Sequence, residues 1–145
     1  RAHTSSRFVR AFSLLRERGV KITVHLIFGL PGEGRQEIME TVERLAAMRP
    51  DAVKIHNLNI AAGSEMEREY RRGELSLPSD SRHLEYVTET LERLPEGTVI
   101  QRVTCDTRQE YLVAPLYFMD KNRFYSLLGK EMQREGLRQG RLFEK

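Results

Sequence analysis

The sequence predicts an α/β fold in which parallel strands alternate with helices. Two observations favour it: segments with helical apolar spacing alternate with short β-branched runs, and residues 24–28 (VHLIF) are almost continuously apolar, which is typical of a buried strand. Such alternation favours parallel strands joined by right-handed crossovers. A complete barrel needs ~250 residues. The 145 residues therefore predict an open doubly wound sheet or an arc of a barrel.

The first half supplies two helices and two strands. Residues 5–18 have helical apolar spacing, a possible cap at Thr4, Ser5 or Ser6, and a stop at Gly19. A strand at 20–30 ends at Pro31, and residues 36–48 form the next helix. A second strand is expected at 52–60. Alternation gives this strand one face with Val53, Ile55, Asn57 and Asn59 and another with Lys54, His56 and Leu58.

The second half predicts a short helix at 64–70, long helices at 81–94 and 121–135, and a third strand at 98–104. Pro95-Glu96-Gly97 separates the first long helix from that strand. We expect two units: residues 1–118 as the barrel portion and residues 119–145 as a C-terminal helical extension.

Composition narrows the class of protein. With 39% hydrophobic and 31% charged residues the chain is expected to be globular, and no window approaches the ~18 apolar residues of a membrane helix. A single cysteine excludes an internal disulfide framework and suits the cytoplasm. The net charge of +3 permits an RNA partner without indicating one. The chain opens with Arg1 instead of Met, which favours an excised fragment.

Gly29-Leu30-Pro31-Gly32 is the most informative segment, because it follows a buried strand. Ligands of parallel α/β folds dock at the carboxyl ends of strands, and glycine permits close approach of a ligand to the backbone. The alternative is an ordinary tight turn before a helix. Neither GxGxxG nor a P-loop is present, so an NAD-type oxidoreductase is disfavoured.

The other reactive side chains give weaker indications. No HExxH metal motif and no GxSxG nucleophile motif occur. His25 and His56 lie in consecutive expected strands and could line one cavity, although a hydrogen-bonded core histidine is the commoner case. Cys105 reads more readily as a buried, inert thiol than as a nucleophile.

The segment HLIFGLPGE, from His25 to Glu33, resembles the fifth-strand region of radical S-adenosylmethionine (radical SAM) barrels. Its surroundings follow in the order that such barrels show. They are Arg1-Ala2-His3, Gly19-Val20-Lys21, residues 50–56, Arg102-Val103-Thr104, residues 112–116 and Arg138-Gln139-Gly140. The chain is thus similar to the C-terminal half of little-characterised radical SAM enzymes grouped with the Elp3-like barrels. This resemblance favours the C-terminal portion of a partial (β/α) TIM-type barrel over an open sheet.

The resemblance implies S-adenosylmethionine and a [4Fe-4S] cluster in the parent protein, where reductive cleavage of the cofactor yields a 5′-deoxyadenosyl radical. The family's CxxxCxxC motif is missing here, so the chain is expected to bind no metal and to be inactive by itself. The implied partners are an electron donor, no membrane, and tRNA through wobble-uridine modification. The alternative is a noncatalytic α/β binding or scaffolding domain.

The resemblance also implies a cofactor wall. Arg1 matches an arginine near the cofactor's carboxylate, and His25 stands where some relatives have an acid on the ribose. Phe28, Gly29 and Pro31 would shape the adenine end, and Asn59 matches a position whose backbone contacts adenine. We expect His25, Thr23 and Ile27 to face the barrel interior, with Leu26 and Phe28 under the helices. An uncovered first strand should make the fragment self-associate.

Overall fold

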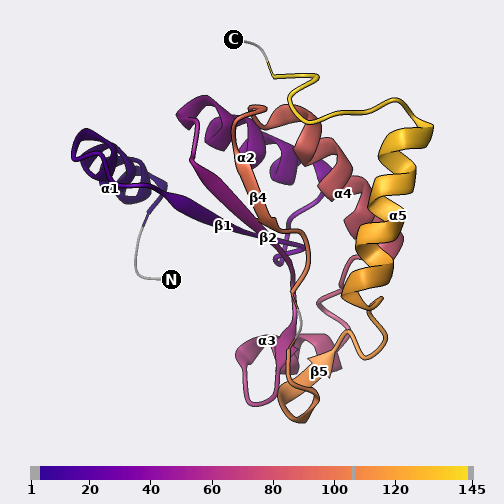
Figure 1. The fold of residues 1–145 in the computed structure, drawn as a ribbon. Coiled ribbons are helices and arrows are strands. Elements are labelled where there is room, and N and C mark those ends of the chain that lie inside the picture. Colours follow the sequence, from indigo (N-terminus) through magenta and orange to yellow (C-terminus); the bar gives the residue numbers. More distant parts are fainter. Residues whose placement is uncertain (1–3, 106, 144–145) are drawn as a thin grey trace.

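The protein is described by a computed structural model covering residues 4–105 and 107–143. Its centre is a parallel sheet in the order β1 (Thr23–Phe28), β2 (Ala52–Asn57), β4 (Val99–Arg102) (Figure 1). All the connections are crossovers that contain helices, as parallel pairing requires. The α/β class with parallel strands and flanking helices is therefore confirmed.

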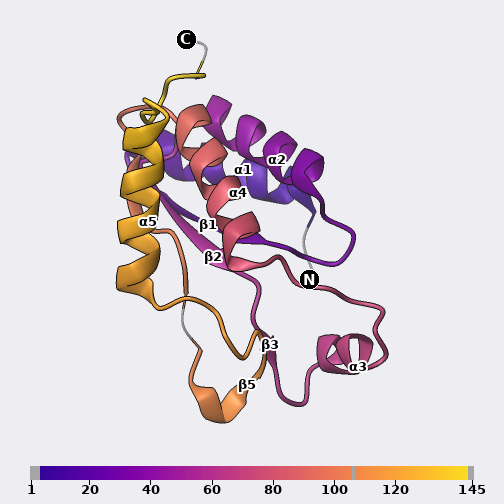
Figure 2. The same cartoon turned by 90° about the vertical axis from the view of Figure 1, so that its right-hand side faces the viewer.

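Three helices cover one face of the sheet: α2 (Arg35–Met48), α4 (Asp80–Arg93) and α5 (Lys121–Arg134) (Figures 1 and 2). The main core lies between them and the sheet, and its fully buried members include Ile38, Val42, Val53, Ile55 and Val87. The caps are local. Ser79 and Asp120 accept backbone hydrogen bonds at the starts of α4 and α5.

Helix α1 (Ser5–Glu17) lies beside β1, at the edge of the sheet far from α5 (Figure 1). Only Phe12 of this helix is buried. The other apolar side chains that share its helical spacing, Phe8, Leu14 and Leu15, are exposed. The described part of the chain therefore leaves most of the apolar face of α1 uncovered.

A second, two-stranded sheet lies beyond the carboxyl end of the main sheet, and its strands come from the segments after β2 and after β4. Here β3 (Ile60–Ala61) pairs antiparallel with β5 (Leu112–Ala114), close to α3 (Glu65–Arg71) and the 3₁₀ turn Gln109–Tyr111 (Figure 2). This part of the structure has its own core of Ile60, Leu75 and Ala114. The short helix was predicted but the pairing of β3 with β5 was not, since strands of two and three residues leave almost no periodic pattern in a sequence.

The expected strand at 52–60 is shorter than predicted. β2 ends at Asn57, and residues 60–61 pair with β5 instead of continuing the parallel ladder. The physical reason lies in the asparagines: Asn57 Nδ2 donates to Asn59 Oδ1 at 2.8 Å, and Asn59 Nδ2 donates to Thr107 Oγ1 at 2.8 Å. These side-chain bonds bend the backbone out of the sheet.

The C-terminal part is tied to the main unit at two places. Phe124 and Leu128 of α5 belong to the main core. Beyond α5, Gln139 donates its side-chain amide to the carbonyls of Pro95 and Thr98 at 2.7 and 2.8 Å. The division into residues 1–118 and 119–145 stays a prediction.

Candidate functional site

The two faces of β1 differ sharply. Val24, Leu26 and Phe28 are buried in the core beneath the helices, whereas Thr23 and His25 are exposed and Ile27 is half-buried. The expected orientation of His25, away from the helical layer, is thus confirmed. The uncovered side of the three-stranded sheet is called the open face below, and it is defined by His25, Ile27, Lys54, His56 and Arg102.

Two histidines stack on the open face. The rings of His25 and His56 lie 5.2 Å apart between centroids, with 19° between their planes. His25 comes from β1 and His56 from β2, where Ile27 is the direct partner of His56 and Lys54 that of His25. The stack presents a flat imidazole surface near the carboxyl ends of the strands, where ligands of α/β folds bind.

Two cationic side chains, Lys54 and Arg102, also belong to the open face. Lys54 pairs with Arg102 across β2 and β4, after an irregularity in register between Val53 and Lys54. Together with His25 they repel a proton on His56. Partial burial first, and then His25, Arg102 and Lys54, hold the pKa of the His56 imidazole below its usual range.

Two buried polar atoms in this region have no hydrogen-bond partner among the described residues: His56 Nε2 and Thr104 Oγ1. Thr104 lies two residues beyond the end of β4 and follows Val103, whose side chain is in the main core. A buried polar atom without a partner is costly, and such atoms commonly await a ligand or water.

The turn after β1 is shaped by two glycines. Gly32 has φ +78° and follows Pro31, as the second central position of a type II turn requires. Gly29 has φ +91°, and a Cβ atom there would lie 2.5 Å from Pro78 Cδ. The space that Gly29 leaves open is therefore occupied by Pro78 of the chain itself, which gives this glycine a packing role.

Glu33 closes the same turn. Its carboxylate accepts a hydrogen bond from the backbone N–H of Leu30 at 3.3 Å. Burial raises the pKa of the Glu33 carboxyl, although hydrogen bonds from Leu30 and Gly29 oppose this and Glu37 adds to it. The turn is thus held by its own polar groups.

The other expected cofactor-wall residues lie apart. The side chain of Phe28 is 2% exposed and packs against His83 and Tyr86 of α4, so only its backbone borders the turn. Asn59 uses its side chain on Asn57 and Thr107, and Pro31 is exposed. Arg1 lies outside the described residues. The cofactor contacts of all six residues stay predictions.

Residues 50–134 match the model of the radical SAM C-terminal domain, which is more than half of the chain. The chain belongs to the radical SAM C-terminal domain family. The suspected radical SAM, Elp3-like character of the sequence is thereby confirmed.

Known proteins similar to this chain match all or nearly all of its length. An uncharacterized protein of Bacillus subtilis, YtqA, is 30% identical over 100% of the chain and 45% of its own length. A tRNA uridine(34) acetyltransferase of Methanocaldococcus jannaschii is 24% identical over 95% of the chain and 26% of its own length. The chain thus spans less than half of each of these relatives.

A solved structure shows the same fold. The Methanocaldococcus infernus Elp3 with an N-terminal deletion superposes with a TM-score of 0.83 at 24% identity, over 96% of this chain and 33% of the other. The partial-barrel architecture expected for a radical SAM protein is confirmed by this match.

The described residues do not fit an iron–sulfur cluster. No group of three or more His, Cys, Asp or Glu side chains that could hold a metal ion occurs among them, and the whole sequence has one cysteine. The stacked imidazoles of the open face suit a flat ring such as the adenine of S-adenosylmethionine. A radical SAM member of this family would need its cluster ligands from other residues.

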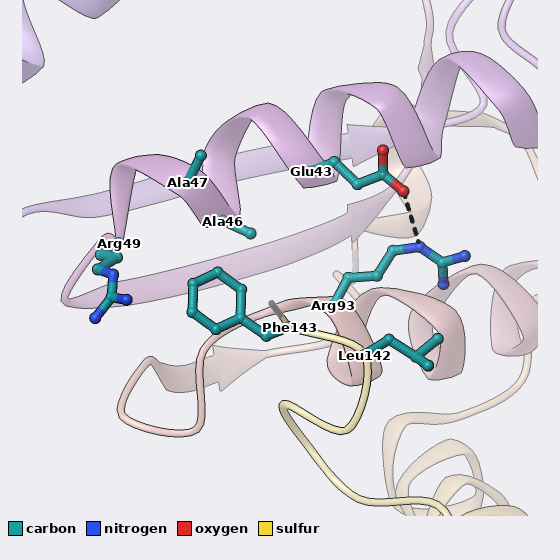
Figure 3. Close-up of a pocket in the computed structure, with 7 residues that line it drawn as sticks. All are labelled: Glu43, Ala46, Ala47, Arg49, Arg93, Leu142 and Phe143. Carbon is teal, nitrogen blue, oxygen red and sulfur yellow. Dashed lines mark hydrogen bonds and ion pairs between the residues drawn. The ribbon is translucent and has the colours of Figure 1, made fainter. Parts of the chain in front are cut away.

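Another hollow, of about 670 Å³, lies near the amino ends of the strands, between α2 and the segment after α5 (Figure 3). Its polar groups have partners: Arg93 donates to Glu43 at 3.3 Å, and the Arg49 guanidinium lies 5.2 Å from the centroid of the Phe143 ring. Because the Arg93–Glu43 ion pair and the contact of Arg49 with the Phe143 ring already engage these side chains, this hollow is a weaker candidate than the open face.

Sequence reasoning named one residue of the open face, His25, as a site residue. Lys54, His56 and Arg102 were missed as site residues. Alternation along β2 had already placed Lys54 and His56 on one face, so the signal was present. Arg102 joins them only through the irregular register between β2 and β4. None of the described helices is both long and apolar enough to cross a membrane.

Proposed function

We propose that this chain forms the cofactor- and substrate-facing part of a radical SAM enzyme. The observation that carries the proposal is the open face, where a histidine stack and unpartnered polar atoms meet near the carboxyl ends of parallel strands. Family membership supports it. The enzyme's cluster would be held by a segment with the CxxxCxxC motif in a longer protein, as relatives more than twice as long as the chain suggest.

The residues expected to contact the cofactor each have a proposed task. The His25–His56 stack would carry the adenosine of S-adenosylmethionine, because flat imidazoles offer both stacking area and hydrogen-bonding nitrogens. The turn at Gly29 and Pro31 would border the adenine through its backbone, as would Phe28 and Asn59. Arg1 would pair with the carboxylate of the methionyl group.

When bound and reduced at a cluster, S-adenosylmethionine supplies a carbon-centred radical that abstracts hydrogen from the substrate. This chain's part is to orient the adenosine and to limit access of water. The depressed pKa of His56 keeps its imidazole neutral near pH 7, so that one nitrogen accepts and the other donates a hydrogen bond.

For the substrate we propose tRNA, with the wobble uridine as the modified position, in the cytoplasm. The support is a set of relatives named tRNA uridine(34) acetyltransferase, from two Methanocaldococcus species. An electron donor completes the set of partners that the chemistry needs.

The test uses the long protein that contains this chain, reconstituted with iron and sulfide and given a chemical reductant. We expect formation of 5′-deoxyadenosine, and a His25→Ala variant with a KM for S-adenosylmethionine raised roughly tenfold, as loss of about one good contact gives. Lys130→Ala on the outer surface of α5 is the control.

Two results would count against this function. A protein that carries the cluster but makes no 5′-deoxyadenosine would favour the noncatalytic binding domain. Unchanged kinetics in the His25→Ala variant would place the cofactor elsewhere.

A further inference from the structure

We propose that the open face carries a binding site for a terminal phosphate group, formed by Lys54 and Arg102 with His56 and Thr104 as additional hydrogen-bond donors. The ligand class is a phosphate monoester or free phosphate. The inference goes beyond the proposed function, because an internal tRNA nucleotide carries phosphodiesters and no phosphate monoester. It shares with that function only the open face as the side where ligands bind.

The two permanent charges have no counter-charge within the part of the chain that the structure describes. Among the described residues neither Lys54 nor Arg102 has an ion pair or a hydrogen bond through its side chain. Elsewhere cations find carboxylates readily, as Arg35 does with Glu89 at 2.6 Å and Lys21 with Asp51 at 2.8 Å. Both cations are half-buried, so they are not simply extended into solvent. Other cations of the described chain that lack such a partner, Arg44 and Lys130 among them, are exposed, so partial burial is what sets Lys54 and Arg102 apart.

Lys54 and Arg102 are neighbours across two paired strands, and His56 lies two residues along β2 from Lys54 on the same face. Their joint repulsion, added to burial, lowers the pKa of the His56 imidazole. The field of these groups therefore overlaps at the His56 ring, and an anion there would interact with all of them.

The number of charges favours phosphate over carboxylate. Lys54 and Arg102 carry two positive charges, and a phosphate monoester carries about −1.5 to −2 at neutral pH. A carboxylate or a phosphodiester carries a single negative charge and would leave one cation unmatched. The donors also suit phosphate: a guanidinium fork, an ammonium, a hydroxyl and an imidazole N–H can reach several phosphate oxygens at once.

Thr104 and His56 would supply hydrogen-bond donors in addition to the two charged groups. Thr104 is 2% exposed, yet neither its hydroxyl nor His56 Nε2 has a hydrogen-bond partner in residues 4–105 and 107–143. Each can donate to a phosphate oxygen at the carboxyl ends of β2 and β4. Binding of a phosphate would thus satisfy two buried atoms and neutralise two cations together.

The test is an NMR titration of the histidine rings in the 145-residue chain, at constant ionic strength. The probes are inorganic phosphate, dimethyl phosphate and acetate. We expect saturable shifts of the His56 signals with inorganic phosphate, at least about tenfold tighter than with either monoanion, since one extra ion pair of this kind has that worth. The pKa of His56 should rise on binding, because attraction replaces repulsion.

Matched variants locate the site. Lys54→Gln and Arg102→Gln keep side-chain length, remove one charge each, and should weaken phosphate binding at least about tenfold. Lys54→Arg should largely restore it. Lys130→Gln and Arg44→Gln, which remove exposed charges on α5 and α2, should leave binding unchanged.

Clear results would overturn the proposal. Equal affinity for phosphate and acetate would show a nonspecific cationic face. Equal affinity for phosphate and dimethyl phosphate would indicate a nucleic-acid backbone site instead. Equal losses in the Lys130→Gln and Lys54→Gln variants would place binding elsewhere. No cofactor enters this test, so its failure is distinguishable from failure to form 5′-deoxyadenosine.

Discussion

His83 is the most completely enclosed titratable side chain of the core. Its ring lies among those of Phe28, Phe118 and Phe124, at centroid distances of 5.9, 5.7 and 5.5 Å. Nε2 donates to the carbonyl of Val103 at 2.9 Å, whereas Nδ1 has no partner among the residues that the structure describes. Burial is the main cause that lowers the pKa of His83 from 6.5 to about 4.

This depressed pKa predicts a loss of stability in mild acid. Below pH 6.5 the unfolded chain binds a proton that folded His83 takes up only near pH 4, so the free energy of unfolding falls across that window. The full loss is about 3 kcal/mol, of which about 2 kcal/mol appears between pH 7.5 and pH 5. Urea unfolding at the two pH values measures it.

The control for this effect is His83→Phe, which has no titratable group. Other groups also titrate over the same range, so the informative quantity is the difference between the two proteins. We expect the variant to lose about 2 kcal/mol less than the parent chain on acidification. Identical losses would mean that His83 is protonated as easily in the folded state as in the unfolded one.

Two glycines of one turn allow a sharp comparison. Gly29→Ala would bring a Cβ atom to 2.5 Å from Pro78 Cδ at a positive φ, whereas Gly32→Ala meets nothing within 4 Å. We expect Gly32→Ala to cost about 1–2 kcal/mol through backbone strain alone. Gly29→Ala should cost roughly 2–4 kcal/mol, because overpacking adds to the strain.

Urea denaturation of both variants provides the measurement. Equal losses would show that Pro78 moves aside without cost. The contact also means that a bulky residue at Gly29 would disturb the fold before it could report on a cofactor. His25 is therefore the better position for testing the cofactor wall.

At the residue scale the sequence predicted well which face of a strand each side chain takes, but less well which side chains come together. Alternation placed His25 away from the helices and separated Val53 and Ile55 from Lys54 and His56, because the pleat fixes which face a residue takes. It could not place Arg102, since a shift in register between β2 and β4 decides its neighbour.

At the scale of elements, α1 carries the most exposed apolar surface. Phe8, Val9, Leu14 and Leu15 are 37–48% exposed, and β1 is an edge strand of the sheet. Unpaired edges and contiguous apolar faces recruit partners. We predict that the 145-residue chain self-associates through this surface, as measured by light scattering over a concentration series.

Substitution on α1 tests the prediction. Leu14→Lys together with Leu15→Lys should lower the apparent mass toward that of a monomer. Leu116→Lys, at an apolar side chain that is 67% exposed near β5, should leave association unchanged. A monodisperse monomer of the parent chain at high concentration would contradict the prediction.

Long elements were predicted to within one or two residues, because apolar periodicity over 13 or 14 residues is a strong signal. The strand at 52–60 was too long by three residues. Its polar end, Asn57 to Asn59, alternates like a strand but bonds to Cys105 and Thr107. Pattern alone does not distinguish these outcomes, since alternation places Asn57 and Asn59 on one face whether or not the strand continues.

At the scale of the whole molecule, the chain lacks the thiolates for an iron–sulfur cluster. It contains one cysteine, Cys105, and clusters usually take several cysteine ligands. We predict that anaerobic reconstitution of the 145-residue chain with iron and sulfide gives no stoichiometric [4Fe-4S] absorbance. Cys105→Ala should behave identically, and a full cluster in the parent chain would contradict the prediction.

The small core of Ile60, Leu75 and Ala114 has a consequence for the way the protein opens. It is separate from the main core, so native-state hydrogen exchange should resolve two cooperative units. Amides of β3 and β5 should exchange through a partial opening of low free energy. Amides of β2 should exchange only through global unfolding. The carboxyl end of the sheet would then be uncovered from time to time without loss of the strands that carry the histidines.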